Sequence, residues 1–343
     1  MVEDAFEKGL EFRLTDPEEL PNDELLCILG GVGGRVPKEV KERVAPYSQK
    51  LKGTTEEAIL RLRKAAEQLS DFIGEKFCSY IATETGPRNG IIPMYMAALE
   101  EKPCVDGDCC GRAKPELALS LTNVAGIPVT PLSIVTPFGE TMILKDGVDD
   151  YRAEDICRYA AIASGGSVSV ARCPARVAVY RKGMVPNQVT KCIKIGAAVR
   201  IARSEGKDPV EAFIGEANAE KLFEGTVTSH EVESRGGFYW GNWYVKGSRE
   251  YQGHSFRVWF KNEYLISWLD GKPCVVCPDL ICIVDARTCH GLSNFVGSGE
   301  YNGRYVVVLA VKAPEAWRTE RGIKIFSPKH FGYDIEYRRL KMV

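Results

Sequence analysis

Residues 24–32, ELLCILGGV, form an apolar run that leads into glycines, with Gly33 and Gly34 close behind it. The pattern predicts a short buried strand followed by a glycine turn, because glycine lets the backbone approach a ligand or another segment closely. The turn has no GxGxxG pattern and lacks the lysine and hydroxyl residue of a P-loop. The run therefore predicts the first strand of a sheet and gives only weak support for a phosphate site.

Strand-like and helix-like segments alternate along the chain after this first run. The clearest helix is predicted at residues 55–73, where apolar side chains recur at helical spacing and Thr54 or Thr55 can cap the start. The other segments are strands at 76–83 and 103–106 and helices at 89–101 and 115–126. This order predicts an α/β domain whose parallel or mixed sheet is flanked by helices.

The second half of the chain has a different pattern. From residue 222 onward, apolar residues alternate or run in short stretches that are separated by glycine turns. This predicts a β-rich C-terminal domain, preceded by a helix at 188–204. A length of 343 residues also favours two domains. We place the α/β domain at residues 1–165 and the β-rich domain at 166–343.

Composition excludes several classes of partner. The formal net charge is -1, which gives no electrostatic case for nucleic acid or an anionic membrane surface. No apolar run approaches the roughly 18 residues that a membrane span needs, and the first 20 residues are acidic, with no basic-then-apolar signal. We therefore expect a cytoplasmic protein, forming a homo-oligomer, whose partner is a small-molecule substrate.

Residues 105–116, VDGDCCGRAKPE, pack charges of both signs into a turn between two apolar segments. Such charges are costly in a packed domain unless they are paired or used. The stretch is therefore the best candidate for a site. The alternative interpretation is a helix-capping turn in which Arg112 pairs with an acid.

Three turns follow predicted strands, at residues 30–34, 84–89 and 106–116. Ligands in open α/β sheets bind beyond the carboxyl ends of the strands. If the strands are parallel, the three turns meet at one edge of the sheet. Glu84 and Asn89 would then lie beside the charged turn.

The side chains of this group suit acid–base chemistry. The carboxylates could exchange protons or supply oxygen ligands to a divalent metal. Arg112 could bind a carboxylate or a developing oxyanion with two donors, and Asn89 could hold an amide or imide carbonyl at a helix N-terminus. We predict Arg112 as catalytic and Asn89 as substrate-binding. The predicted catalytic acids are Glu84, Asp106, Asp108 and Glu116.

The chain has twelve cysteines and four histidines. Most cysteines lie in strand-like runs, where they are expected to be small buried hydrophobic residues. The CxxC at Cys274 and Cys277 has no second CxxC, and no two histidines have HxH or HxxxH spacing, so neither pattern favours zinc. A nucleophilic thiolate at Cys109 or Cys110 is left open, because a nearby cation could lower its pKa.

Residues 103–117, PCVDGDCCGRAKPEL, resemble the PVVDADGMGRAFPEL core of the S-methyl-thiohydantoin desulfurase-like family, long catalogued as a domain of unknown function. The sequence lacks the GTGGGG turn with which members usually begin, and residues 86–89 read GPRN where members usually have Gly-Gly-Glu-Asn. Further matching motifs follow in order over residues 24–338. They are ETGPRN, AGIPVTP, FEGTV, GGFYWG, FKNEYL, PDLICIVD, AWRTERGI and SPKHFGYD.

The resemblance implies an α/β part followed by a β-rich part, and hydrolytic attack on a ring carbon of a hydantoin- or thiohydantoin-like imide. In the β-rich part, Asn262, Glu263 and Asp279 match family motifs, and we predict them as substrate contacts. A divalent metal, with zinc the favoured ion, is left open as a cofactor. A non-catalytic protein or subunit that keeps the cleft and binds a small molecule is the alternative function.

Overall fold

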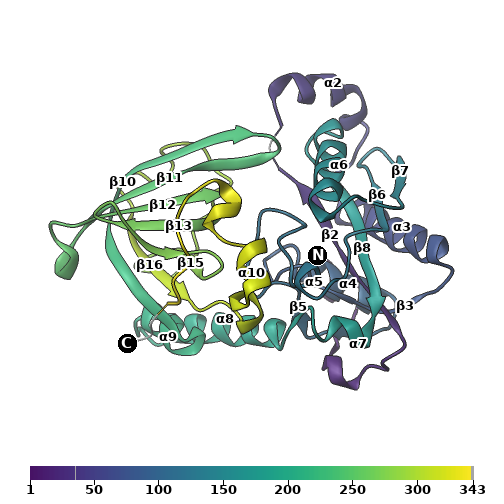
Figure 1. Cartoon of the computed structure of the whole chain (residues 1–343), viewed down its shortest axis with the longest axis horizontal. Coiled ribbons are helices and arrows are strands. Elements are labelled where there is room, and N and C mark those ends of the chain that lie inside the picture. Colours follow the sequence, from purple (N-terminus) through teal and green to yellow (C-terminus); the bar gives the residue numbers. More distant parts are fainter. Residues whose placement is uncertain (35, 341–343) are drawn as a thin grey trace. The chain divides into compact units, whose positions relative to one another are not determined.

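The computed structural model describes residues 1–34 and 36–340 (Figure 1). The chain divides into two compact units, Met1–Val189 and Thr190–Val343, and each has its own sheet. The predicted border at 165/166 falls before strand β8 (Ser167–Arg176), which pairs within the first sheet. The predicted fold class, an α/β part followed by a β-rich part, is confirmed.

The first unit contains, in the described chain, a five-stranded mixed sheet with the strand order β3-β2-β8-β6-β7. Strands β2 and β3 are parallel, whereas β8 pairs antiparallel with β2 and β6, and β7 pairs antiparallel with β6. The strands other than β8 are β2 (Leu25–Gly33), β3 (Phe77–Ile81), β6 (Leu132–Val135) and β7 (Thr141–Leu144).

Helices cover both faces of this sheet, and its interior strand β2 is accordingly apolar on both sides. Cys27 and Leu29 pack in one core with helices α3 (Thr55–Ile73) and α4 (Ile91–Leu99). Leu26 and Ile28 point the other way, into a core with helix α6 (Asp150–Ala163). Helix α3 has the predicted bounds, and Thr54 caps it by accepting from the amide of Glu57. The smaller elements are α1 (Val2–Glu7), β1 (Leu14–Thr15), η1 (Pro17–Glu19), α2 (Lys38–Ser48), β4 (Cys104–Val105), β5 (Gly107–Asp108), α5 (Leu121–Val124), α7 (Val177–Tyr180) and β9 (Val185–Pro186).

Two predicted elements of this unit are wrong. Residues 30–33 do not form a turn, because strand β2 continues through them and Gly33 pairs with Ser167. The glycine permits close strand contact there, since a Cβ on Gly33 would lie 2.4 Å from the Gly166 carbonyl oxygen. The helix predicted at 115–126 is reduced to α5, because the carbonyls of Glu116 and Leu117 accept from the Lys114 ammonium and the Leu121 amide donates to Cys109 instead of Leu117.

The second unit contains, among the described residues, a seven-stranded antiparallel sheet that curls into a half-barrel, with the order β14-β13-β12-β11-β10-β16-β15. Aromatic side chains such as Trp243, Phe256 and Phe260 fill its interior. Its strands are β10 (Ala219–Arg235), β11 (Phe238–Gly247), β12 (Ser255–Lys261), β13 (Glu263–Leu269), β14 (Lys272–Val276), β15 (Leu280–Asp285) and β16 (Tyr305–Val311). Its helices are α8 (Gln188–Ser204, which begins in the first unit), α9 (Pro209–Ala217), α10 (Glu320–Ile325), η2 (Arg249–Tyr251), η3 (Glu315–Arg318) and η4 (Pro328–Phe331).

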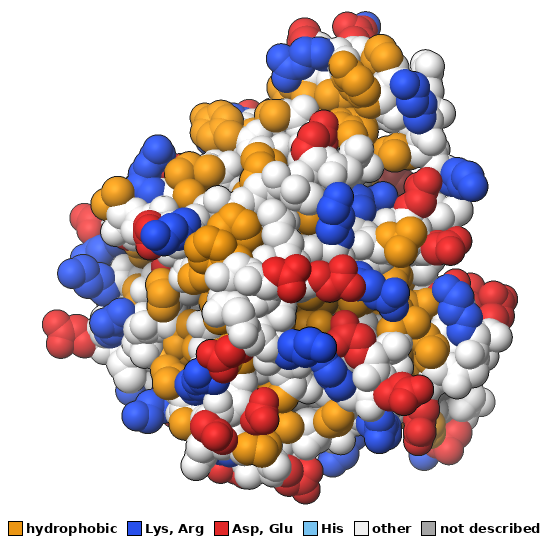
Figure 2. Space-filling model, turned by 90° about the vertical axis from the view of Figure 1, so that its right-hand side faces the viewer, with side chains coloured by type: hydrophobic (Ala, Val, Ile, Leu, Met, Phe, Trp, Pro, Cys, Tyr) orange, Lys and Arg blue, Asp and Glu red, His pale blue; other side chains and the backbone are white. Residues whose placement is uncertain are grey.

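The surface carries charges of both signs. On the face drawn in Figure 2, acidic and basic side chains are interspersed, as expected from a net charge of -1. Among the described residues, none of the helices combines the length and the apolar character that crossing a membrane requires.

Candidate active site

The charged turn is fixed to the end of strand β3 by backbone pairing. Asp108 bridges Ala82 in parallel register, and the amide of Cys109 donates to the Ala82 carbonyl at 3.1 Å. On the other side, β5 pairs antiparallel with β9. A Cβ on Gly107 would lie 2.9 Å from the Val185 carbonyl oxygen, so this close pairing requires glycine. The turn is therefore a rigid extension of the first unit.

Asp108 joins the charged turn to the 84–89 turn. Its Oδ2 accepts hydrogen bonds from the Thr85 amide at 2.7 Å and the Thr85 hydroxyl at 2.8 Å. Its Oδ1 accepts from the amides of Cys110 at 2.9 Å and Gly111 at 2.5 Å. Only 1% of the residue is exposed, and burial raises the pKa of Asp108 while the four donors oppose that rise. Both carboxylate oxygens are thus engaged in holding the two turns together.

Glu84 lies at the same junction and is partly exposed, unlike the other three predicted acids, which are buried. Its Oε1 accepts from the Asn89 side-chain amide at 2.8 Å, and its Oε2 accepts from the Lys114 backbone amide at 2.6 Å. Burial raises the pKa of Glu84, and the Lys114 charge and the Asn89 hydrogen bond act in the opposite direction. A partly exposed carboxyl with a raised pKa suits proton exchange.

Lys114 is a buried member of this junction that the sequence did not single out as a site residue. Its Nζ donates to the carbonyls of Glu116 at 2.9 Å and Leu117 at 3.3 Å. Burial lowers the pKa of Lys114, and the nearby charge of Arg172 lowers it further. Its place in the motif beside Pro115 gave no sign that its side chain turns inward.

Arg172, on strand β8, is the second buried cation near the junction, and its exposed fraction is 1%. Its Nη2 donates to the Thr83 hydroxyl at 2.5 Å, and its Nη1 donates to the Cys173 sulfur at 3.1 Å. Sequence analysis missed this residue. The available signal was an arginine inside the otherwise apolar strand SVSVARC, a place where charge is rarely tolerated without a use.

A buried ion pair from helix α6 supports the same turn. Glu154 and Arg158 lie 2.8 Å apart, and Glu154 also accepts from the Leu117 amide at 2.5 Å. Arg158 donates to the carbonyls of Gly33 at 2.8 Å and Pro115 at 3.1 Å. The pair thus links α6 and strand β2 to the charged turn, and sequence analysis did not identify it.

The structure brings the three predicted segments together. Glu84 contacts Lys114 and Thr85 contacts Asp108, while Asn89 Oδ1 lies 3.4 Å from the position of a Cβ on Gly30. The remaining predicted residues of the turn are also buried in this unit, and the Arg112 Nε donates to the Ala113 carbonyl at 3.0 Å. These residues are Asp106, Arg112 and Glu116.

Three of the predicted substrate contacts lie in the second unit. Asn262 has a left-handed backbone conformation and exchanges two hydrogen bonds with Tyr239, one of them through its side-chain oxygen at 2.9 Å. Glu263 is the first residue of β13 and is partly buried. The contact of these two residues and of Asp279 with a substrate stays a prediction.

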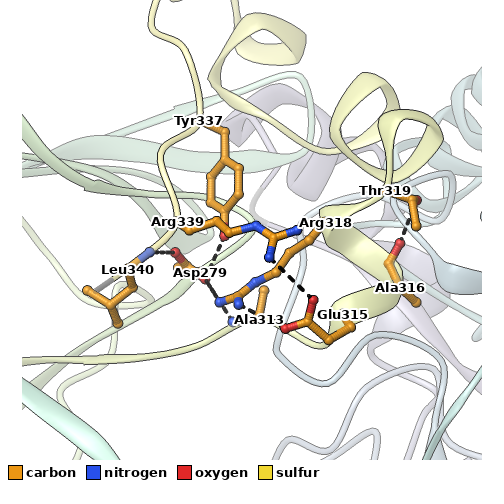
Figure 3. A network of polar contacts seen from close by, with 9 residues as sticks. All are labelled: Asp279, Ala313, Glu315, Ala316, Arg318, Thr319, Tyr337, Arg339 and Leu340. Carbon is orange, nitrogen blue, oxygen red and sulfur yellow. Dashed lines mark hydrogen bonds and ion pairs between the residues drawn. The ribbon is translucent and has the colours of Figure 1, made fainter. Parts of the chain in front are cut away.

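Asp279 is the centre of a buried polar network (Figure 3). Its Oδ1 accepts from the Ala313 amide at 2.8 Å, and from Arg318 and the Tyr337 hydroxyl at 3.2 Å each. Its Oδ2 accepts from the Leu340 amide at 3.2 Å. The carboxylate therefore anchors the segment that contains Tyr337 and Leu340 to the rest of the second unit.

The cysteines and the metal option can also be judged from the geometry. Cys109 and Cys110 are fully buried, and burial raises the pKa of both thiols, which disfavours a thiolate nucleophile. Among the described residues, no three His, Cys, Asp or Glu side chains are grouped so that they could hold a metal ion. The divalent metal left open above does not fit this donor set.

The two parts of the chain match two models of a single family. Residues 1–146 match the S-Me-THD-like N-terminal domain, and residues 148–340 match the S-Me-THD-like C-terminal domain. The chain belongs to the S-Me-THD-like family. The predicted family resemblance is confirmed, and the charged turn of this S-Me-THD-like chain lies within the N-terminal match.

A crystal structure of a protein from Chromobacterium violaceum has a similar fold. It matches the S-Me-THD-like chain with a TM-score of 0.75 and 19% identity, over 96% of this chain and 87% of that chain. At this identity the likeness shows the fold alone. The curated proteins contain no match to the chain.

Proposed function

We propose that this S-Me-THD-like protein is a hydrolase that acts on a five-membered imide or thioimide ring of the hydantoin or thiohydantoin class. One observation carries the proposal: Glu84, the partly exposed carboxyl of the junction, is oriented by Asn89 and Lys114 and has a raised pKa. Membership of the S-Me-THD-like family supports the ring class.

The proposed reaction begins with Glu84 accepting a proton from water as the water oxygen bonds to a ring carbon. With a thiohydantoin, the C–S bond then breaks, sulfur leaves as hydrogen sulfide with both water protons, and a carbonyl remains. With a hydantoin, a ring C–N bond breaks, the nitrogen takes a proton and the carbon becomes a carboxylic acid. A pKa raised toward the working pH suits Glu84 to both taking and returning the proton.

Asn89 is the group that we assign to ring recognition. One N–H of its amide is used by Glu84, which leaves a second N–H and the carbonyl oxygen as a donor and an acceptor side by side. An imide ring presents the complementary pair, a carbonyl beside an N–H. Asn89 would thus place the ring carbon next to the carboxyl that activates water.

Asp108 supports the proposal as a structural residue. Its four hydrogen bonds leave little capacity for a further proton acceptor role, and they hold Thr85, the residue after Glu84, to the charged turn. This occupied state also favours the second candidate function, a non-catalytic small-molecule-binding protein, because it removes one of the acids that catalysis could use.

The test is turnover of a panel of hydantoins and thiohydantoins by the purified protein, with sulfide release and ring opening measured separately. Glu84→Gln should lower the rate by roughly a hundredfold or more, as loss of a general base does. Glu42→Gln is the matched control, because Glu42 lies on the surface in an exposed pair with Lys38. Undiminished turnover in Glu84→Gln would contradict the proposal. Binding of intact ligands in a thermal-shift screen, without product, would favour the non-catalytic alternative.

A further inference from the structure

Both the backbone amide and the side-chain charge of Lys114 bear on Glu84. Its backbone amide donates to Glu84 Oε2 at 2.6 Å, which fixes one carboxylate oxygen. Its side chain is buried, and two backbone carbonyls, those of Glu116 and Leu117, hold the ammonium group in place. The residue whose amide fixes Glu84 thus also carries an ammonium group that is buried and held in one position in the same turn.

The other charged groups around Lys114 are already engaged. Glu154, on α6, is paired with Arg158 at 2.8 Å. Arg172, on β8, adds a second positive charge, and Cys110 of the same turn has a buried thiol. The negative charge of Asp108 opposes ionisation of Glu84. Asp108 is itself held by four hydrogen bonds. Lys114 is therefore the main charge that favours the ionised form of Glu84.

We propose that Lys114 is a positioning residue for Glu84: its amide orients the carboxylate, and its ammonium charge favours the ionised form of that partly exposed carboxylate. This inference rests on the proposed function, in which Glu84 accepts the proton from water. Without the charge, burial would favour the neutral form of Glu84 more strongly, and the neutral form cannot accept a proton. The residue acts through Glu84 and has no assigned contact with substrate.

The test is an infrared titration of the Glu84 carboxyl, whose band is identified by its loss in Glu84→Gln. Lys114→Gln keeps the backbone amide and a donor for the two carbonyls but removes the charge. Its Glu84 titration midpoint should rise by about one to two pH units. Lys114→Arg keeps the charge and should return the midpoint close to that of the unaltered protein. Lys38→Gln, on the exposed face of α2, is the matched control and should leave it unchanged. An unchanged midpoint in folded Lys114→Gln would overturn the proposal.

A reciprocal measurement covers the case in which Lys114→Gln fails to fold. Charge coupling acts equally on both partners, so loss of the Glu84 charge must make Lys114 release its proton more readily. Hydrogen-ion titration of folded Glu84→Gln should place this release about one to two pH units lower than in the unaltered protein. Superimposable titration curves would overturn the proposal.

The two failures are distinguishable, because neither titration uses a substrate. A shifted Glu84 midpoint without turnover of any ring would overturn the hydrolase assignment and leave the coupling in place. Turnover that depends on Glu84, with an unshifted midpoint, would overturn the coupling and leave the hydrolase assignment in place.

Discussion

Asp108 accepts two hydrogen bonds from Thr85, one from the backbone amide at 2.7 Å and one from the hydroxyl at 2.8 Å. Together with the amides of Cys110 and Gly111, these donors surround a buried carboxylate. The relationship joins two turns that are separated by more than twenty residues in sequence. It makes Asp108 the residue on which the geometry of the junction depends most directly.

Asp108→Asn should destabilise the protein by about 2–4 kcal/mol, because a side-chain NH₂ would face backbone N–H groups that now donate to oxygen. Denaturant unfolding followed by fluorescence would measure the loss. Thr85→Ser keeps both donors and serves as the matched control, with an expected change below about 1 kcal/mol. Equal stability of Asp108→Asn and Thr85→Ser would mean that the four hydrogen bonds do not hold the junction.

Glycine substitutions should separate tight from open backbone positions. Gly33→Ala should destabilise the first unit by about 2 kcal/mol or more, because its Cβ would lie 2.4 Å from a backbone oxygen. Gly215→Ala, inside α9, has no atom within 4 Å of the new Cβ and should stabilise by about 0.5–1 kcal/mol through helix propensity. Thermal unfolding of both variants checks the expected opposite signs.

The parts of the fold that depend on local pattern were predictable. Helix α3 shows this, because its apolar spacing and the cap at Thr54 are both contained in its own sequence. The helix predicted from residue 115 failed because the carbonyls of Glu116 and Leu117 accept from the buried Lys114 ammonium, and the Leu121 amide donates to the Cys109 carbonyl instead of closing a helical turn. A pattern within one segment carries no information about such partners.

The candidate site was predictable to a similar extent. The rule that ligands lie beyond strand ends placed Glu84, Asn89 and Asp108 together, although only β2 and β3 of that sheet are parallel. The inward direction of the Lys114 side chain depends on burial, which its sequence context does not reveal, whereas the apolar run around Arg172 did carry a signal. Sequence reasoning therefore singled out the acids and the arginine of the charged turn itself and missed Lys114, Arg172 and the Glu154–Arg158 pair.

The buried pair of Asp279 and Arg318 should behave differently from a surface pair. Asp279→Ala should cost about 3–5 kcal/mol, because it removes the buried carboxylate that pairs with Arg318 and leaves the buried guanidinium with the exposed Glu315 as its acidic partner. The double variant Asp279→Ala/Arg318→Leu should recover part of this loss. Removal of the exposed Lys38–Glu42 pair should cost less than about 1 kcal/mol. A double-mutant cycle measured by urea unfolding tests this, and strict additivity of the two substitutions would contradict it.

Thiol labelling tests the cysteine option. Cys192 and Cys274 are exposed and should react first with a thiol reagent under native conditions. Cys109 and Cys110 are buried, and burial raises the pKa of both thiols, so they should react only when the protein unfolds. Mass spectrometry of digested protein would locate the label. Rapid native labelling of Cys109 or Cys110, with protection by a substrate, would restore the thiolate mechanism.

The burial of the His230 ring leads to a prediction of how the stability of the protein depends on pH. It is 1% exposed and packs against Trp243 and Tyr301 with ring centroids 4.4 Å and 5.3 Å away. Burial lowers the pKa of His230 from 6.5 to about 4. The folded state therefore prefers the neutral ring, whereas the unfolded chain takes up a proton as the pH falls below about 6.5. Stability should decrease from pH 6.5 down to about 4, by roughly 2–3 kcal/mol from this residue, and this contribution should change no further below that.

His230→Phe keeps an aromatic ring in the same position and removes the titrating group. Urea unfolding at pH 7 and at pH 4.5 should show a smaller loss of stability for this variant than for the unaltered protein, because other groups still titrate in both. The two proteins share every other ionisable residue, so the difference between their losses isolates His230. Equal losses would show that the His230 ring is protonated in the folded state at pH 4.5. The aromatic side chains around it would then admit water or a counter-charge.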